Sequence, residues 1–109
     1  MVKDKSIRVL ERINGAKIIT VALYEVSKDE SNGFIDYVDE RWGKARHRFA
    51  FVLYKDIEDN GHKAEDVKKL LNNALINGLR LDLVMERRQA TPKQQFDWLI
   101  KVERAEFFG

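Results

Sequence analysis

The sequence has 109 residues and no cysteine, and its 20 Lys and Arg residues nearly balance its 18 Asp and Glu residues, leaving a net charge of +2. This composition excludes a disulfide framework and a thiolate metal site. The length predicts a single domain, residues 1–109, with its own core, and the elements described below make this domain α+β. No run of 18 apolar residues and no charged-then-apolar leader occurs, so we expect a cytoplasmic protein outside the membrane.

The N-terminal part contains one ambiguous segment and one turn signal. We expect residues 1–5 to be frayed. Ser6–Ile13 alternates imperfectly between apolar and polar residues, which predicts a strand; a helix from Asp4 that ends at Gly15 is the alternative. The dipeptide Asn14-Gly15 is typical of a tight β-hairpin turn.

The next segment, Lys17–Val26, supports two predictions. Its run of Ile18, Ile19, Thr20 and Val21 is β-branched and favours a strand. Ile19, Ala22, Leu23 and Val26 follow the i, i+3, i+4, i+7 spacing of an amphipathic helix. The local sequence does not decide between them.

The middle of the chain centres on a strand predicted at Arg46–Lys55, where aromatic and β-branched residues are uninterrupted by Gly or Pro. Before it we expect a polar turn at Ser27–Gly33, a short strand or a single helical turn at Phe34–Val38, and a charged loop at Asp39–Ala45. After it, Asp56–Gly61 reads as a loop.

The two faces of the Arg46–Lys55 strand follow from alternation, because successive side chains point to opposite sides. One face carries His47, Phe49, Phe51 and Leu53, and the other carries Arg46, Arg48, Ala50, Val52 and Tyr54. In one interpretation the two Phe residues belong to the core, as most apolar residues do. In the other, Ala50, Val52 and Tyr54 pack inward while Phe49 and Phe51 stand on an open sheet face, where aromatic rings stack on nucleobases.

The C-terminal half has clearer periodicity. Lys63–Asn77 has a helical apolar stripe, and Gly78 is suited to the left-handed position that ends a helix. Leu79–Arg87 alternates as a half-buried strand. Thr91-Pro92 reads as the start of a helix over Gln94–Arg104, so that residues 91–109 form a C-terminal helical extension.

From Phe34 to about Arg87 the chain resembles an RNA recognition motif (RRM) domain. Phe49, Ala50, Phe51, Val52, Leu53 and Tyr54 fit the last six positions of that family's strand signature. The basic loop before them and the helix and strand after them follow the family's order. The resemblance implies a βαββαβ fold in which Lys17–Val26 is the first helix, and bases that stack on Phe49 and Phe51.

The resemblance also implies roles for the surrounding cations. Lys44, Arg46 and Arg48 would contact phosphates or stack on a base, and Arg8 stands where the family's first strand offers an aromatic ring. Trp42 is a second candidate for stacking on a base. Arg87 and Arg88 would share one phosphate-binding patch with the loop if the last strand neighbours the central one.

These elements predict an antiparallel sheet of about four strands packed by two helices, ferredoxin-like in order, plus a C-terminal helix. An N-terminal β-hairpin or meander followed by helix, strand and helix is the alternative. No nucleophile, metal-ligand or phosphate-loop pattern occurs, so we expect no enzyme, no cofactor and no metal.

The predicted function is binding of single-stranded RNA or DNA on a sheet face. A non-enzymatic protein-binding module, an inhibitor or adaptor that occludes a partner, is the alternative. The sequence leaves the oligomeric state open.

Overall fold

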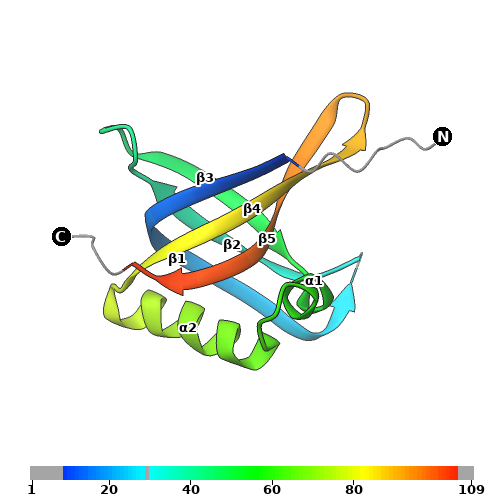
Figure 1. Ribbon diagram of the computed structural model, residues 1–109, viewed down its shortest axis with the longest axis horizontal. Coiled ribbons are helices and arrows are strands. Elements are labelled where there is room, and N and C mark those ends of the chain that lie inside the picture. The colour runs from blue at the N-terminus through cyan, green and yellow to red at the C-terminus, as the bar shows by residue number, and fades with distance from the viewer. Residues whose placement is uncertain (1–8, 29, 106–109) are drawn as a thin grey trace.

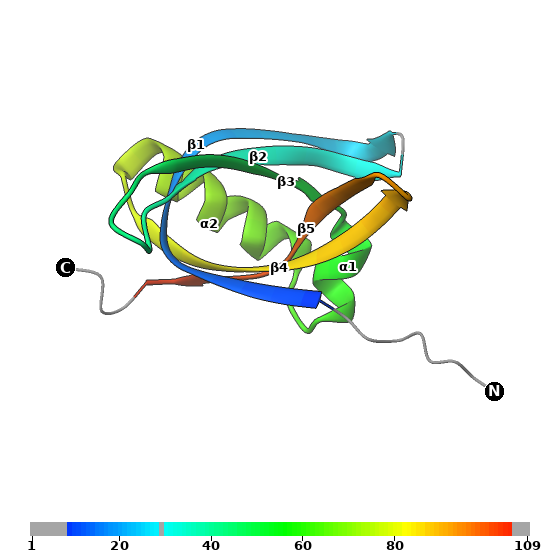
Figure 2. The same cartoon turned by 90° about the horizontal axis from the view of Figure 1, so that it is seen from above.

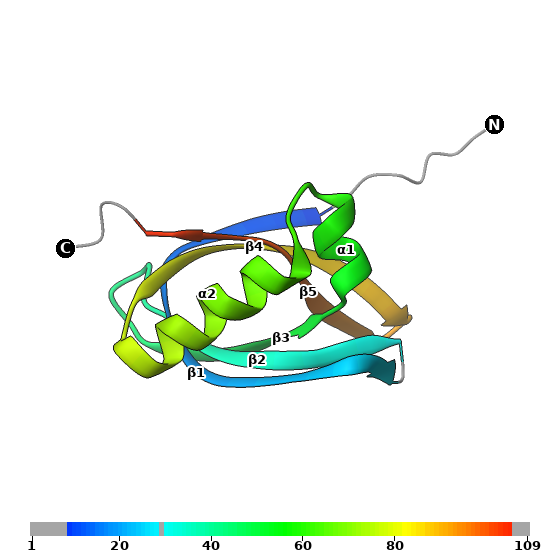
Figure 3. The same ribbon diagram turned by 90° about the horizontal axis from the view of Figure 1, so that it is seen from below.

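The computed structural model describes residues 9–28 and 30–105, apart from the side chains of residues 28 and 90. Five strands close into a barrel in the order β1-β2-β3-β5-β4 (Figure 1). The strands are β1 Val9–Lys28, β2 Ser31–Asp39, β3 Arg46–Val52, β4 Arg80–Thr91 and β5 Gln94–Arg104. Two helices, α1 Tyr54–Asp59 and α2 Ala64–Asn77, connect β3 to β4, and α2 lies across the barrel (Figure 3).

The fold predicted from the sequence, an open ferredoxin-like sheet with helices packed on it, is therefore wrong, and so is its hairpin-first alternative. The largest difference is β1, a single strand of 20 residues that includes the segment Lys17–Val26. Its helical spacing was coincidental; the β-branched run at residues 18–21 was the better signal, because this part of β1 pairs with β2.

The Asn14-Gly15 signal marks a bend within β1 and not a hairpin turn. Gly15 has a φ of 69°, and the pairing of β1 with β4 shifts register between Ile13 and Ala16, as at a β-bulge. β1 pairs with β4 from Val9 to Lys17, and from Lys17 onward it pairs with β2. Figure 2 shows β1 turning around one end of the molecule, and this turn is what closes the sheet into a barrel.

The predicted C-terminal helix is also wrong, because Gln94–Arg104 is strand β5. It pairs with β4 along its length, from Leu81 opposite Arg104 to Thr91 opposite Gln94. Thr91 caps a tight turn and not a helix, since its Oγ1 accepts a hydrogen bond from the Lys93 backbone N–H at 3.2 Å. A helix after Pro92 would have left β4 without its second partner strand.

Other elements agree with the sequence. The helix predicted at Lys63–Asn77 is confirmed as α2, and Gly78 follows it with a φ of 70°. The strand predicted at Leu79–Arg87 is confirmed within β4. The central strand predicted at Arg46–Lys55 is confirmed only over Arg46–Val52, as β3, because Tyr54 and Lys55 begin α1. The loop predicted at Asp56–Gly61 is largely helix α1. Residues 1–5 and Phe107 and Phe108 lie outside the described residues.

The core fills the inside of the barrel and the space under α2. Ala50 and Val52 of β3 point into it and are fully buried. From α2 it receives Val67, Leu71 and Ala74, so the apolar stripe predicted for this helix is its buried side. Among the described residues, neither helix has the length and apolarity that crossing a bilayer requires.

Candidate functional site

Five aromatic side chains from three neighbouring strands gather on the outside of the barrel. They are Phe34 of β2, Phe49 and Phe51 of β3, and Phe96 and Trp98 of β5, together called the aromatic face below. Phe51 is at the centre: its ring centroid lies 5.3 Å from Phe49, 5.4 Å from Phe96 and 5.1 Å from Trp98. The ring centroids of Phe34 and Phe49 lie 6.3 Å apart. Phe49 is 41% exposed and the other four rings are half-buried.

This face exists because β3 alternates. Ala50 and Val52 are small enough to fill the barrel interior, and this turns Phe49 and Phe51 outward. The pairing of β3 with β2 and β5 then sets Phe34 and Trp98 on either side of Phe51. Of the two interpretations of this strand, the one with outward Phe residues describes its geometry.

Arg48 lies on the opposite, inward side of β3 and belongs to a network of ion pairs. Its guanidinium contacts Glu11 at 2.9 Å, Asp97 at 3.0 Å and Asp39 at 3.1 Å. A second guanidinium, Arg41, binds Asp39 at 2.8 Å and also donates to Glu11. The Arg48 side chain is 12% exposed and the Asp39 side chain is fully buried. The network lies at one mouth of the barrel, where it links β1, β2, β3 and β5.

The network favours the ionised forms of two of its carboxylates, Glu11 and Asp39. The hydrogen bonds from Arg48 and then Arg41 lower the pKa of Glu11 from 4.5 to about 2, against the opposing effect of burial. The hydrogen bond from Arg41 likewise lowers the pKa of Asp39 from 3.8 to about 2. Tyr37, buried beside Arg48, has its pKa raised by burial and stays neutral.

The barrel has a seam between β3 and β5. Among the described residues these parallel strands pair only at Phe51 with Trp98 and at Val52 with Leu99. Toward the starts of both strands a side-chain bridge spans the gap, because Asp97 of β5 accepts from Arg48 of β3 at 3.0 Å. Asp97 also accepts from Arg87 of the neighbouring strand β4 at 3.1 Å. The seam is therefore closed by ion pairs where backbone pairing ends.

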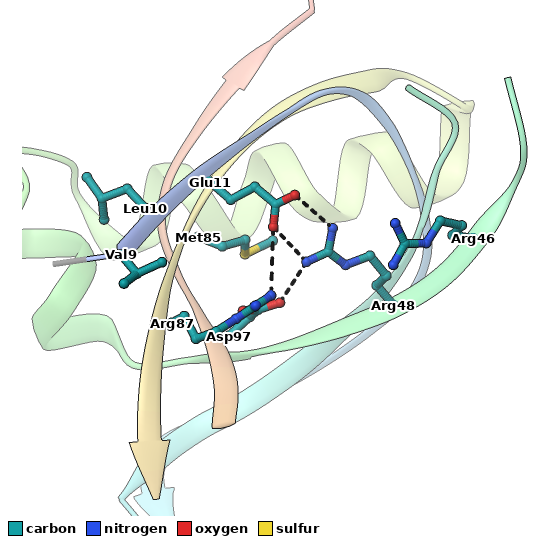
Figure 4. Close-up of a pocket in the computed structure, with 8 residues that line it drawn as sticks. All are labelled: Val9, Leu10, Glu11, Arg46, Arg48, Met85, Arg87 and Asp97. Carbon is teal, nitrogen blue, oxygen red and sulfur yellow. Dashed lines mark hydrogen bonds and ion pairs between the residues drawn. The ribbon is translucent and has the colours of Figure 1, made fainter. Parts of the chain in front are cut away.

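Two hollows flank this bridge and share Arg46, Arg48, Arg87 and Asp97. The outer hollow, about 360 Å³, reaches the aromatic face and is completed by Phe49, Gln95 and Phe96. The mouth hollow, about 420 Å³, lies at the end of the barrel and is completed by Val9, Leu10, Glu11 and Met85 (Figure 4). Together they form one groove that runs from the aromatic face to the barrel mouth.

The structure brings some of the predicted site residues together and separates others. Phe49 and Phe51 come together on the aromatic face, while Arg46 and Arg87 line the groove. Arg48 lines it too, but its guanidinium is held by the ion pairs of the network. Trp42 and Lys44 are exposed in the β2–β3 loop. The guanidinium of Arg88 lies 5.0 Å from the centroid of the Trp98 ring. Arg8 is outside the described residues.

Sequence reasoning missed Phe34, Phe96 and Trp98. Phe96 and Trp98 are two residues apart, which is the spacing of one face of a strand, but the predicted C-terminal helix separated them. It also missed Glu11, Asp39 and Asp97, whose proximity depends on barrel closure. Among the residues that the structure describes, no group of three or more His, Cys, Asp or Glu side chains could hold a metal ion.

The sequence matches no family model, and comparisons with curated proteins and with solved structures give no significant match. The function is therefore argued from the geometry of the aromatic face and the groove.

Proposed function

We propose that this protein is a binding module, not an enzyme, and that it holds single-stranded nucleic acid on the aromatic face. The observation that supports this most is the continuous cluster of five rings on the outside of β2, β3 and β5. A contiguous group of apolar rings on the surface of a monomer is typical of an interaction site. Aromatic rings exposed on a sheet stack on unpaired bases, at about 1–3 kcal/mol per base.

Cations around the face support the same ligand. Arg46 and Arg87 line the groove at its edge, and Lys44 and Trp42 are exposed in the β2–β3 loop. Arg88 lies over Trp98, bound to Asp56 at 2.9 Å and Glu86 at 2.7 Å, so it orients that ring more than it offers a free charge. A net charge of +2 fits stacking with a few phosphate contacts better than binding by charge alone.

The architecture is compatible with this function. A five-stranded barrel with helices between its third and fourth strands is similar to the OB-fold, whose second and third strands form an oligonucleotide- or oligosaccharide-binding face. Phe34, Phe49 and Phe51 lie on those two strands here. Likeness of architecture gives no function by itself, so the proposal depends on the rings.

The test is a titration of fluorescent single-stranded RNA and DNA, followed by anisotropy, with the wild-type chain and Phe49→Ala. Phe49 is the most exposed ring of the face, and its loss should weaken binding about 5- to 100-fold. Ile76→Ala is the matched control, because it removes apolar surface from a residue that is 78% exposed on α2.

Equal binding by Phe49→Ala and Ile76→Ala would contradict stacking on the aromatic face. Absence of wild-type binding at low salt to both RNA and DNA would reject the nucleic-acid proposal. The same apolar surface would then be assigned to a protein partner that the chain occludes or recruits.

A further inference from the structure

We infer that the mouth hollow binds the phosphorylated end of the strand that stacks on the aromatic face. This inference rests on the proposed function and adds to it a ligand group, a site for that group and a direction for the strand. Figure 4 shows the residues concerned, with the guanidinium of Arg46 directed toward the ion pairs of the mouth.

The charges at the mouth leave room for an anion. Three carboxylates, Glu11, Asp39 and Asp97, are each bound by at least one of the guanidinium groups of Arg41, Arg48 and Arg87. Arg46 lines the same hollow as a fourth guanidinium, and among the described residues none forms an ion pair or hydrogen bond with it. The site thus carries one unmatched positive charge, beside an Arg87 side chain that is 43% exposed.

The groove connects this charge to the aromatic face. Arg46 and Arg87 line both hollows, and the outer hollow includes Phe49 and Phe96. On the other side of Phe49 the register places Asp36 of β2, whose carboxylate repels phosphate. A strand stacked on Phe49 is therefore expected to turn its phosphates toward the seam and away from β2.

The mouth suits the end of a strand better than its middle. The floor of the hollow is Met85, which is 1% exposed, and the barrel interior behind it is filled by fully buried residues such as Ile13, Tyr37 and Leu83. A strand cannot continue through this core. A terminal phosphate also carries a charge of about −1.5 to −2, more than an internal phosphodiester, and so gains more from two guanidinium groups.

The experiment compares one short single strand in three forms: with a 5′-phosphate, with a 3′-phosphate, and with hydroxyl groups at both ends. The dye is attached internally, and Kd is measured for the wild type, Arg46→Gln and Lys69→Gln. Arg46→Gln removes a side chain that forms no ion pair or hydrogen bond with another described residue, so we expect the fold to be retained. Lys69→Gln is the matched control, because it removes one charge from the exposed side of α2.

We expect one phosphorylated form to bind about tenfold more tightly than the hydroxyl form, which is the worth of one charge-assisted hydrogen bond. This gain should vanish in Arg46→Gln and remain in Lys69→Gln. The inference is overturned if neither phosphate increases affinity, or if the gain survives in Arg46→Gln.

Failure of the proposed function gives a different result: either no form of the strand binds, or Phe49→Ala leaves the Kd unchanged. A free mononucleotide offers the same phosphate chemistry, so it is added as a competitor. Displacement of the hydroxyl-ended strand by the mononucleotide, with no gain from either terminal phosphate, would assign the hollow to free nucleotides and reject the strand-end inference.

Discussion

At the scale of single residues, the functional division of this protein follows the two sides of β3. Phe49 and Phe51 face outward to build the aromatic face, and Arg46 and Arg48 face the barrel mouth. The two arginines are two residues apart on the same side of the strand, but they have different roles. Arg48 bonds three carboxylates and is 12% exposed, whereas Arg46 is exposed at the rim.

Arg48→Gln should lower the free energy of unfolding by about 3 kcal/mol, because it leaves Glu11, Asp39 and Asp97 short of their shared counter-charge. Arg46→Gln, two residues away on the same side, should change it by less than about 0.5 kcal/mol. Urea denaturation followed by tryptophan fluorescence measures both values. Equal effects of the two substitutions would show that the network is not a structural element.

At the scale of elements, the barrel depends on how closely β1 and β2 approach. Gly33 of β2 pairs with Leu23 of β1 and has a φ of 137°. A Cβ atom at this position would lie 1.9 Å from the carbonyl oxygen of Ala22, which is backbone and cannot rotate away. Glycine is thus required here by both conformation and space.

Gly33→Ala is therefore expected to cost at least about 3 kcal/mol, or to prevent folding, through the clash with β1. Gly78→Ala is the control: Gly78 has a φ of 70° but open space around it, so only conformational strain of about 1–2 kcal/mol applies. Thermal unfolding by circular dichroism compares the two variants. A Gly33→Ala protein as stable as Gly78→Ala would contradict the close approach of the two strands.

At the scale of the whole molecule, ion pairs complete a barrel that backbone hydrogen bonds leave partly open. The ion pair between Arg48 and Asp97 spans the seam, and Arg87 of β4 binds the same Asp97. Glu11 connects both guanidinium groups to the start of β1. Closure of the molecule is therefore coupled to the protonation of carboxylates at one end of the barrel.

This coupling predicts acid sensitivity. Glu11 and Asp39 have pKa values lowered in the folded state, from 4.5 and 3.8 to about 2, so the unfolded chain binds protons first as pH falls. Their contribution to stability is complete above the unfolded pKa values, near pH 5, and is lost as pH falls toward 2. Denaturation midpoints at pH 7, 4 and 2.5 should fall in that order, and the fall should be smaller in Glu11→Gln. A constant midpoint down to pH 2.5 would exclude this role.

The sequence determined the elements whose signals are local. The amphipathic stripe and Gly78 define α2, and the alternation of Leu79–Arg87 and of Arg46–Lys55 defines two strands, because these periodicities reflect which side of each element is buried. It also singled out Phe49 and Phe51, which contact each other on the aromatic face, and Arg46, which lines the outer hollow with Phe49.

Only the tertiary structure decided the rest. Lys17–Val26 and Gln94–Arg104 each carry a helical and an extended pattern, and their state depends on partner strands far away in the chain. The Asn14-Gly15 dipeptide predicted a hairpin turn, but the chain continues as one strand with a bulge there, because β1 pairs with β4 before it and with β2 after it. The aromatic face and the groove arise from the same closure, because Phe96, Trp98, Asp97 and Glu11 reach β3 only when the barrel forms.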